Sequence, residues 1–217
     1  MSLRLEVSDI SKSYDGKHVL KDCSFVFDNG IYALMGPNGC GKSTFMRICA
    51  LLENPDRGRV AYFSEAGDVR QDINLRRRIS LVLPGIGLFN TSVFKNVAYG
   101  LKIRGMQKKS IEEKTKTMLE FVGLSGKSRQ NALTLSSGES QRLGIARAMV
   151  IVPEILFLDE PTASVDQENT WIIEGIILKM KRDRKTTVVI ATHDREQAER
   201  LADRIISVRD GKISVYK

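Results

Sequence analysis

The chain has 217 residues, of which 42% are hydrophobic and 28% are charged, a composition ordinary for a soluble globular protein of one or two domains. Its apolar runs, such as Ile155–Leu158 and Val188–Ala191, fall far short of the roughly 20 residues that cross a bilayer, and charged residues interrupt those at the N-terminus, so we expect neither a membrane span nor a signal peptide. The net charge of +8 suits a polyphosphate, a nucleic acid or an anionic membrane alike and excludes none of them.

The first third of the chain predicts short strands and one helix. Apolar and polar residues alternate in Leu3–Val7 and in Cys23–Phe27, which indicates strands, with an Asp-Gly turn at 15–16. Ile31–Met35 is a compact apolar run, and it therefore predicts a buried strand. A helical pattern follows over Lys42–Leu52.

Helical patterns fill the middle of the chain, and strands and helices alternate in the last third. The predicted helices of the middle are Ser92–Ile103, Ser110–Val122 and Ser137–Val152. The later elements are a strand at Ile155–Leu158, a helix at Gln167–Met180, a strand at Thr186–Ala191 and a helix at Arg195–Ala202. Strands that alternate with helices predict an α/β fold, with a largely parallel sheet covered on both faces and a helical block inserted between its two halves.

A glycine-rich loop joins the buried strand to the first helix. Its pattern, G-x-x-x-x-G-K-S, is that of a phosphate-binding loop in the required strand–loop–helix setting, although a purely structural glycine turn is the alternative. Backbone amides of such a loop converge on phosphates, and the following helix presents its positive end to them. We expect Lys42 to reach the β- and γ-phosphates of ATP and the Ser43 hydroxyl to ligate Mg²⁺. The predicted nucleotide-binding residues of the loop are Gly36, Pro37, Asn38, Gly39, Cys40, Gly41, Lys42, Ser43 and Thr44.

Two carboxylates follow the apolar run 155–158. Asp159 and Glu160 would lie at the carboxyl end of a buried strand, which is the edge where ligands bind in α/β sheets. We expect Asp159 to hold Mg²⁺, directly or through water, and Glu160 to act as the general base on the attacking water. A solvated turn is the alternative for such a pair, and the phosphate loop in the same chain favours the functional interpretation.

The run Leu135–Arg142, with the sequence LSSGESQR, resembles the signature of ABC ATPases and precedes the Asp159-Glu160 strand at the distance usual in that family. Further elements fall in the family's order: Tyr14 at the aromatic that stacks on adenine, Ser164–Asp166 at the D-loop and Thr192–Asp194 at the switch histidine. The resemblance covers essentially the whole chain. It implies one ATP-binding cassette with a RecA-like P-loop NTPase core (about 1–87 and 153–217), an N-terminal antiparallel β subdomain and an inserted helical subdomain (about 88–152).

The resemblance also implies roles for single residues. Lys42, Glu160 and His193 would be catalytic, with His193 donating a hydrogen bond to the γ-phosphate. The remaining nucleotide ligands would be Tyr14, Ser136, Ser137, Gly138, Glu139 and Asp166. Each has a plainer interpretation taken alone, since a lone tyrosine or histidine is more often structural and a Ser-Ser-Gly run at a helix start is also an ordinary helix cap.

Partners and location follow from the resemblance. Two cassettes of this family sandwich two ATP molecules head to tail, so the chain is expected to pair with a copy or a homologue, and to dock on integral membrane permease subunits. Three cysteines without CxxC spacing argue against disulfides and structural zinc, in agreement with a cytoplasmic protein peripheral to the inner face of the membrane. No nucleic-acid partner is expected.

The chain departs from the family at the Q-loop. Aligning Ile79–Pro84 with the family's strand into this loop puts Pro84 where a glutamine helps to ligate Mg²⁺ or to orient water. Proline has neither a side-chain oxygen nor an amide hydrogen, so we expect nucleotide binding to survive while turnover or coupling is weakened. Ser137 and Glu139 also replace the glycine and glutamine of the usual signature.

The length and the single cassette favour a transporter subunit, with a non-transport ABC ATPase (assembly, cell-division or DNA-associated) as the alternative. The segment Leu88–Gly105 resembles that of ATPases of prokaryotic oxyanion importers, particularly of the tungstate type. We therefore expect ATP hydrolysis that powers import, with substrate selectivity residing in other subunits.

Overall fold

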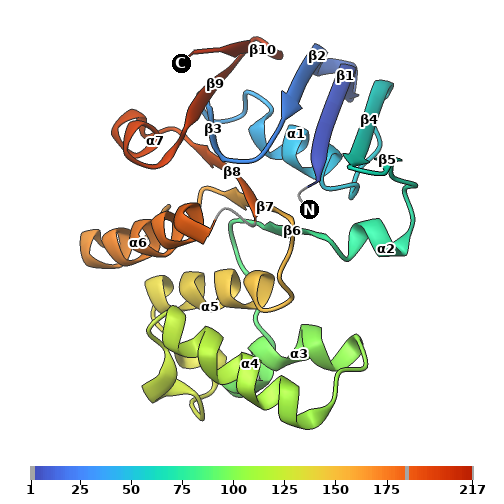
Figure 1. Cartoon of the computed structure of the whole chain (residues 1–217). Coiled ribbons are helices and arrows are strands. Elements are labelled where there is room, and N and C mark those ends of the chain that lie inside the picture. The colour runs from blue at the N-terminus through green and yellow to red at the C-terminus, as the bar shows by residue number, and fades with distance from the viewer. Residues whose placement is uncertain (1–2, 184–185, 217) are drawn as a thin grey trace.

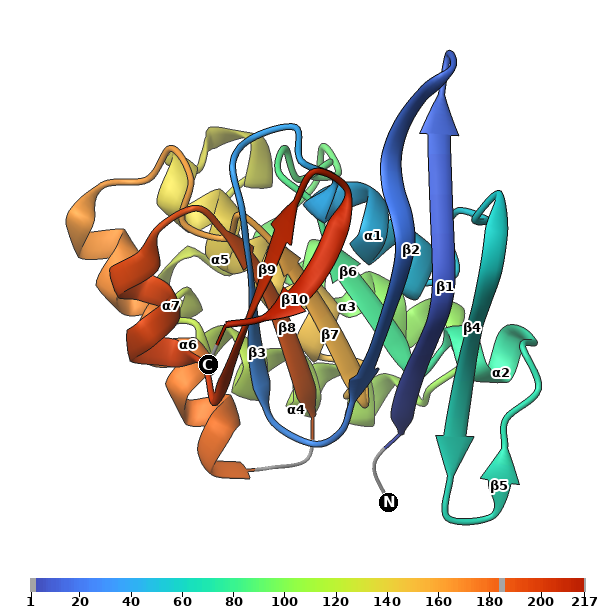
Figure 2. The ribbon, with the colours of Figure 1, turned by 90° about the horizontal axis from the view of Figure 1, so that it is seen from above.

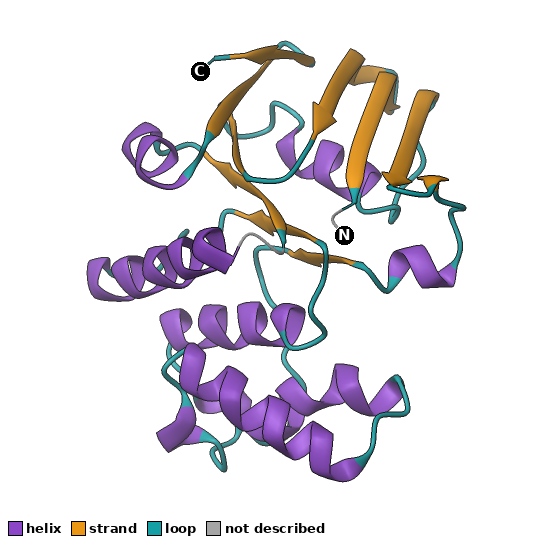
Figure 3. Cartoon of the chain, viewed as in Figure 1, coloured by secondary structure: helices purple, strands orange, loops and turns teal. Residues whose placement is uncertain are grey.

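The computed structural model describes residues 3–183 and 186–216, which form two β-sheets with helices between and around them (Figure 1, Figure 3). Within this range the smaller sheet has four antiparallel strands in the order β2-β1-β4-β5: β1 (Arg4–Tyr14), β2 (Lys17–Phe27), β4 (Arg57–Ser64) and β5 (Gly67–Asp68). Over the same residues the larger sheet has the order β10-β9-β3-β8-β7-β6: β3 (Ile31–Met35), β6 (Ile79–Val82), β7 (Ile155–Asp159), β8 (Thr187–Thr192), β9 (Arg204–Arg209) and β10 (Lys212–Val215). Its strands pair in parallel except for the hairpin of β9 and β10.

The described helices fall into three places around the sheets. They are α1 (Lys42–Cys49), α2 (Ile73–Arg76), α3 (Val93–Ile103), α4 (Lys108–Phe121), α5 (Ser137–Met149), α6 (Gln167–Asp183) and α7 (Arg195–Leu201), with 3-10 turns at Ser125–Lys127 and Ala132–Thr134. Helix α1 lies between the two sheets, α6 and α7 lie beside the larger one, and α3, α4 and α5 form a block at one end of the molecule (Figure 1, Figure 2).

The burial pattern of the strands explains this arrangement. In β3 and β7 side chains are buried on both faces, as expected for strands of a parallel sheet covered on both sides. On one face, Phe45 and Met46 of α1 join a core that includes Leu34 and Phe157. On the other, Leu156 and its neighbours pack with α3, α5 and α6 in a second core. The phosphate loop is therefore held between a buried strand and a buried helix.

The predicted α/β fold is confirmed, including the antiparallel N-terminal strands and the helical block. The strands β1 and β2 are longer than predicted because they continue to the Asp-Gly turn, where Tyr14 pairs with Lys17. The strands β4 and β5 and the short helix α2 were not predicted. In β4 only Val60, Ala61 and Tyr62 are buried. The residues before them, including Arg57 and Arg59, are exposed, so the strand shows no regular alternation.

Two helices end earlier than the sequence pattern predicts. Helix α1 ends at Cys49, before Leu51, whose φ is 58°. Helix α5 ends at Met149, before Val152, whose φ is 53° and which precedes a proline. A residue with a left-handed backbone conformation cannot continue a right-handed helix. Nothing in the sequence pattern predicts this conformation at either position. Helix α4 begins two residues earlier than predicted, at Lys108.

None of the described helices combines the length and the apolar character that a bilayer crossing requires.

The loop between β6 and α3 is organised by one buried amide. Asn96 of α3 has no exposed surface, and its Oδ1 accepts a hydrogen bond of 2.9 Å from the backbone amide of Phe89. Its Nδ2 donates to the carbonyl oxygens of Phe89, Thr91 and Ser92 at 3.1–3.3 Å. One side chain thus pairs four backbone groups at the end of the loop that carries Pro84.

Replacing Asn96 by alanine is expected to destabilise the protein by about 2–4 kcal/mol, because buried backbone groups lose their partners. The matched control is Asn131→Ala at an exposed hydrogen bond to Asn90, which is expected to cost clearly less. Chemical denaturation followed by circular dichroism measures both. Equal losses in the two variants would contradict the role of Asn96.

Candidate functional site

The phosphate loop, residues 36–44, turns sharply between β3 and α1. A Cβ atom at Gly36 would lie 2.4 Å from the carbonyl oxygen of Val208 in β9, and one at Gly41 would lie 2.9 Å from that of Val19. Gly41 also has a φ of 108°, which side chains rarely tolerate. Both glycines are therefore required by close backbone approach, and the path of the loop is fixed on both sides.

Lys42 folds back over this loop. Its side chain is almost fully buried, and Nζ donates hydrogen bonds to the carbonyl oxygens of Gly36 at 2.7 Å and Pro37 at 3.2 Å. Nζ also lies 3.6 Å from Oε1 of Glu160. The ammonium group is thus held at the centre of the loop, where it can exchange these partners for phosphate oxygens.

Asp159 is the last residue of β7 and carries a buried carboxylate. Only 1% of the residue is exposed, and neither carboxylate oxygen has a hydrogen-bond partner among the described residues. Burial raises the pKa of Asp159, the nearby Ser43 hydroxyl opposes this shift, and the charge of Glu160 adds to it. A buried carboxylate left unpaired beside a hydroxyl is a site that suits a cation.

This pair of side chains fits Mg²⁺ in particular. Magnesium is held in proteins by one or two carboxylates together with waters and substrate phosphates, rather than by a full cage of side chains. Accordingly, no cluster of three or more His, Cys, Asp or Glu side chains able to hold a metal occurs among residues 3–183 and 186–216. Ser43 and Asp159 are the residues that would hold the ion.

Glu160 and His193 lie together at the same edge of the sheet. Glu160 follows β7 and His193 follows β8, and these strands are parallel neighbours. Nδ1 of His193 lies 3.1 Å from Oε2 of Glu160, and most of the imidazole is exposed. With Lys42, they form a cluster from three separate parts of the chain, as the sequence predicts for residues at the carboxyl ends of parallel strands.

Tyr14 lies outside this cluster. It ends β1, is 40% exposed, and its hydroxyl donates a hydrogen bond to Glu53. Glu53 also accepts from Nε of Arg47 at 3.2 Å, and Arg47 is 3.4 Å from the hydroxyl of Thr44. Tyr14 is therefore linked to the end of the phosphate loop through α1. A role of its ring in stacking on adenine stays a prediction.

The signature run caps helix α5. Ser136 Oγ accepts from the amide of Glu139 at 3.3 Å, and the Glu139 carboxylate accepts from the amide of Ser136 at 3.0 Å, a reciprocal capping box. Lys127 pairs with the same carboxylate. Glu139 is thus engaged within its own chain, while Ser137 at the helix start is exposed.

The signature and the D-loop segment pack against each other. A Cβ atom at Gly138 would lie 2.2 Å from the side chain of Asn169, so glycine is needed there for the close approach. Asp166 accepts hydrogen bonds from the amide and the side chain of Asn169, and the backbone hydrogen bond lowers the pKa of Asp166. Asp166 therefore caps α6 next to the signature.

A cavity of about 390 Å³ lies between the Pro84 loop, the start of α5 and the turn after β7. Pro84 lines it together with Ser137, Gln141 and Glu160. Gln141 is 8% exposed, and its Nε2 has no hydrogen-bond partner among the described residues. No role was predicted for Gln141, although its place in the signature run was a signal for one.

Comparisons with known proteins show the family of the chain. Residues 20–163 match the family described as ABC transporter. The chain belongs to the ABC transporter family. It is 38% identical over 213 residues to the tungstate uptake system ATP-binding protein TupC of Peptoclostridium acidaminophilum, covering 97% of each chain. It is also 38% identical over 224 residues to the phosphate import ATP-binding protein PstB 2 of Natronomonas pharaonis, covering 96% of this chain and 78% of the other.

A solved structure extends the likeness to the fold and to the reaction. A dimeric ATP-binding cassette in a post-hydrolysis state, bound to ADP and Pi, superposes with a TM-score of 0.86 at 25% identity, covering 98% of each chain. The predicted P-loop NTPase fold is confirmed by this match. As a member of the ABC transporter family, the chain is an ATP-binding subunit of a transporter and hydrolyses ATP.

Replacing Asp159 by asparagine is expected to stabilise the nucleotide-free protein at pH 7. The raised pKa means that the folded state binds the proton more tightly than the unfolded state, so stability falls as pH rises from the ordinary carboxyl pKa of about 4 to the folded value and stays lower above it. Asparagine removes this loss, and the gain should shrink as the pH is lowered towards 4. Thermal unfolding without magnesium measures it.

Asp166→Asn is the matched control with the opposite sign. Because the folded pKa of Asp166 is lowered, its charge stabilises the fold above the ordinary carboxyl pKa, and the variant should be less stable at pH 7. An Asp159→Asn protein no more stable than the wild type would contradict an uncompensated charge at Asp159.

Proposed function

We propose that Lys42, Glu160 and His193 carry out hydrolysis of ATP, with Mg²⁺ held by Ser43 and Asp159. The supporting observation is the cluster of these three side chains beside a buried carboxylate that lacks a partner. Magnesium, when bound, would neutralise charge on the transferred phosphoryl group. The phosphates would take the place of the Gly36 and Pro37 carbonyls at Lys42, leaving Glu160 free to accept a proton from the attacking water.

His193 would bind the γ-phosphate through its exposed imidazole. Its Nδ1 already faces Glu160, so the same residue can orient the base through one ring nitrogen and donate to phosphate through the other. The loop residues 36–44 would hold the phosphates through their amides, and Tyr14 would stack on the adenine.

A second cassette, a copy or a homologue, completes the site in this proposal. Ser136, Ser137, Gly138 and Glu139 begin α5, and Asp166 lies next to them. Head-to-tail pairing would bring these residues to the nucleotide on the partner's phosphate loop, where two hydroxyls and a helix start suit the γ-phosphate. We assign the pairing surface to this face, and divide the cassette into a core at about 1–87 and 153–217 and a helical subdomain at about 88–152.

The transporter that this subunit drives is proposed to be a prokaryotic importer of tungstate or a related oxyanion. The two relatives named above serve tungstate uptake and phosphate import, and the segment Leu88–Gly105 adds to this support.

The chain would then lie at the inner face of the membrane on permease subunits, with no nucleic-acid partner. A non-transport ATPase is not favoured, because both relatives are named for import. Copurification with a permease tests this; stable association with ribosomes or DNA would contradict it.

Glu160→Gln is expected to lower the ATPase rate by about 10²–10⁴-fold while ATP still binds, because only the proton acceptor is lost. Since hydrolysis would no longer break the sandwich, Mg-ATP should hold the variant as a dimer. Phosphate release and sedimentation velocity with Mg-ATP measure the two effects.

The control for this variant is Glu168→Gln, which removes an exposed carboxylate at the start of α6. It should hydrolyse ATP like the wild type and should not remain dimeric. A Glu160→Gln protein that hydrolyses ATP at the wild-type rate would contradict the assignment of Glu160 as the general base.

Pro84→Gln is expected to raise the ATPase rate by about tenfold, the order gained when a water is better oriented. Pro84 brings no polar atom to the cavity that it shares with Glu160, and glutamine would supply one. Pro84→Leu, which restores the backbone amide hydrogen without adding a polar side-chain group, is the control. An unchanged rate together with an unchanged magnesium dependence in Pro84→Gln would count against a role for this position.

A further inference from the structure

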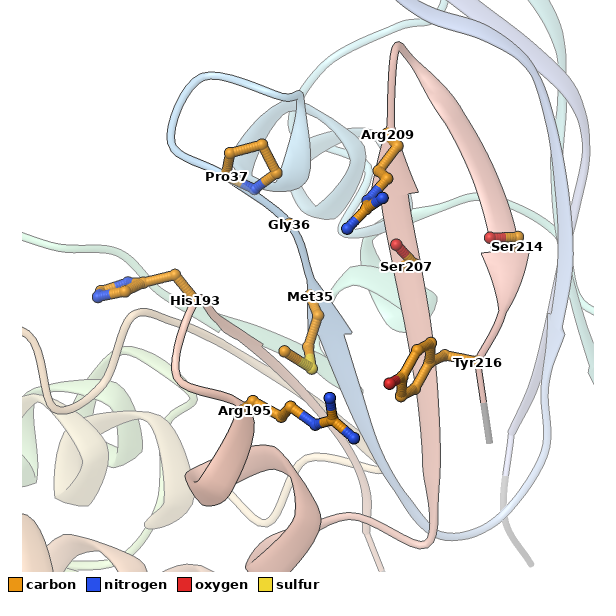
Figure 4. Close-up of a pocket in the computed structure, with 9 residues that line it drawn as sticks. All are labelled: Met35, Gly36, Pro37, His193, Arg195, Ser207, Arg209, Ser214 and Tyr216. Carbon is orange, nitrogen blue, oxygen red and sulfur yellow. The ribbon is translucent and has the colours of Figure 1, made fainter.

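A second cavity, of about 460 Å³, lies beside the phosphate loop at the ends of β3, β9 and β10 (Figure 4). Its wall includes Gly36 and Pro37 of the loop and His193 of the proposed catalytic cluster, but not Lys42, Ser43 or Glu160, so it adjoins the nucleotide site without coinciding with it. The volume is within the range of small-molecule sites.

The strand pattern brings polar side chains to this cavity. Ser207 and Arg209 alternate in β9 and so share one face of the sheet, and Ser214 of β10 is the register partner of Ser207. Neither serine hydroxyl makes a hydrogen bond within the described residues, so both are free to bind a ligand. The sheet thus presents two hydroxyls beside one guanidinium group.

The cavity is cationic. Figure 4 shows Arg209 and Arg195 extending toward it from opposite sides, and no carboxylate is among its described lining residues. Arg209 has no ion pair in the described part of the chain. Arg195 uses Nε for a 2.8 Å contact with Glu199, and its guanidinium lies 5.5 Å from the ring centre of Tyr216. These contacts hold Arg195 in place at the cavity.

Apart from His193, the remaining lining is largely apolar. The side chain of Met35 and the ring of Tyr216 lie between the two arginines (Figure 4). An occupant can therefore place an anionic group against the guanidinium and hydroxyl groups and rest an uncharged part on these two side chains.

We propose that this cavity binds a small molecule that carries a phosphate group. The guanidinium group of Arg209 and the hydroxyls of Ser207 and Ser214 suit the oxygens of one dianion, since arginine binds phosphate through paired, charge-assisted hydrogen bonds, and Arg195 adds positive charge on the opposite side. Free phosphate and a phosphate ester offer the same group, and the apolar lining suits the ester.

Occupancy of this cavity weakens nucleotide binding at the phosphate loop. The two sites share Gly36 and Pro37 as a wall, and a Cβ atom at Gly36 would lie only 2.4 Å from the Val208 carbonyl, so β9 and the loop are in tight contact. A second phosphate group so close to the nucleotide phosphates adds like-charge repulsion. By linkage, the nucleotide then weakens the second ligand equally.

Calorimetric titration tests the site, with inorganic phosphate and phenyl phosphate as probes and with the phosphate loop saturated by Mg-ADP. Arg209→Gln and, separately, Arg195→Gln should weaken probe binding by about tenfold or more through loss of charge-assisted hydrogen bonds. The matched control is Arg204→Gln, at the other end of β9 with its side chain over the Tyr32 ring, and it should bind like the wild type.

The two probes separate the sources of the phosphate group. Tighter binding of phenyl phosphate supports an ester as the occupant, and equal binding supports the free ion. Absence of binding of both probes to the wild type would overturn the proposal, as would unchanged binding in the Arg209 and Arg195 variants or an equal loss in Arg204→Gln.

The coupling is tested by ADP titration with and without phenyl phosphate. Competition at the phosphate loop itself would lower ADP affinity equally in the wild type and in Arg209→Gln, whereas coupling through the cavity lowers it further in the wild type alone. An equal effect in the two proteins would overturn the coupling.

Discussion

The site depends on one buried charge without a protein partner, the carboxylate of Asp159. Transfer of an ionised carboxylate into a protein interior costs free energy unless the charge is paired. At the end of β7 the carboxylate of Asp159 is buried and neither of its oxygens has a hydrogen-bond partner among the described residues. The residue is held there by the parallel pairing of β7 with β6 and β8, which leaves it no freedom to turn toward solvent. A magnesium ion brought with the nucleotide would supply a partner for this carboxylate, so ligand binding would offset the cost of burying its charge.

The charged groups next to Asp159 differ from it because they have partners within the chain. Glu160 is the next residue, and its carboxylate is shared between Lys42 and His193 rather than left unpaired. Lys42 in turn donates hydrogen bonds to two loop carbonyls, so Lys42 and Glu160 both have partners within the chain. Polyphosphate and metal together would replace these internal contacts. The signature is engaged in its own capping box at the start of α5 and contributes nothing to this set.

Much of the fold could be predicted from the sequence because its main signals are local. Ile31–Met35 was predicted with its observed bounds, since a short apolar run between turns has few other interpretations. The strand β4 was missed because its pairing with β1 is long-range and its exposed charges hide the buried residues. Helix ends were misplaced where a single residue, Leu51 or Val152, adopts a left-handed conformation that tertiary packing imposes.

The candidate site could likewise be predicted only in part. Asp159 and Glu160 could be placed at one sheet edge from the sequence because they come at the end of an apolar run, and the resemblance to the family added His193. The return of Lys42 to the loop carbonyls and the unpaired amide of Gln141 could not, since both depend on side-chain packing. The cationic cavity of Arg195 and Arg209 also escaped prediction, because the register of β9 against β10 and the start of α7 bring its residues together.

The most direct test of this account is the effect of magnesium on nucleotide affinity. ADP binding would be measured by calorimetry with and without Mg²⁺, in the wild type and in the protein with asparagine at position 159. We predict that magnesium tightens ADP binding by about tenfold or more in the wild type, as expected when a buried charge gains its partner, and has little effect in the variant. An equal gain from magnesium in both proteins would contradict the claim that Asp159 is the group the ion completes.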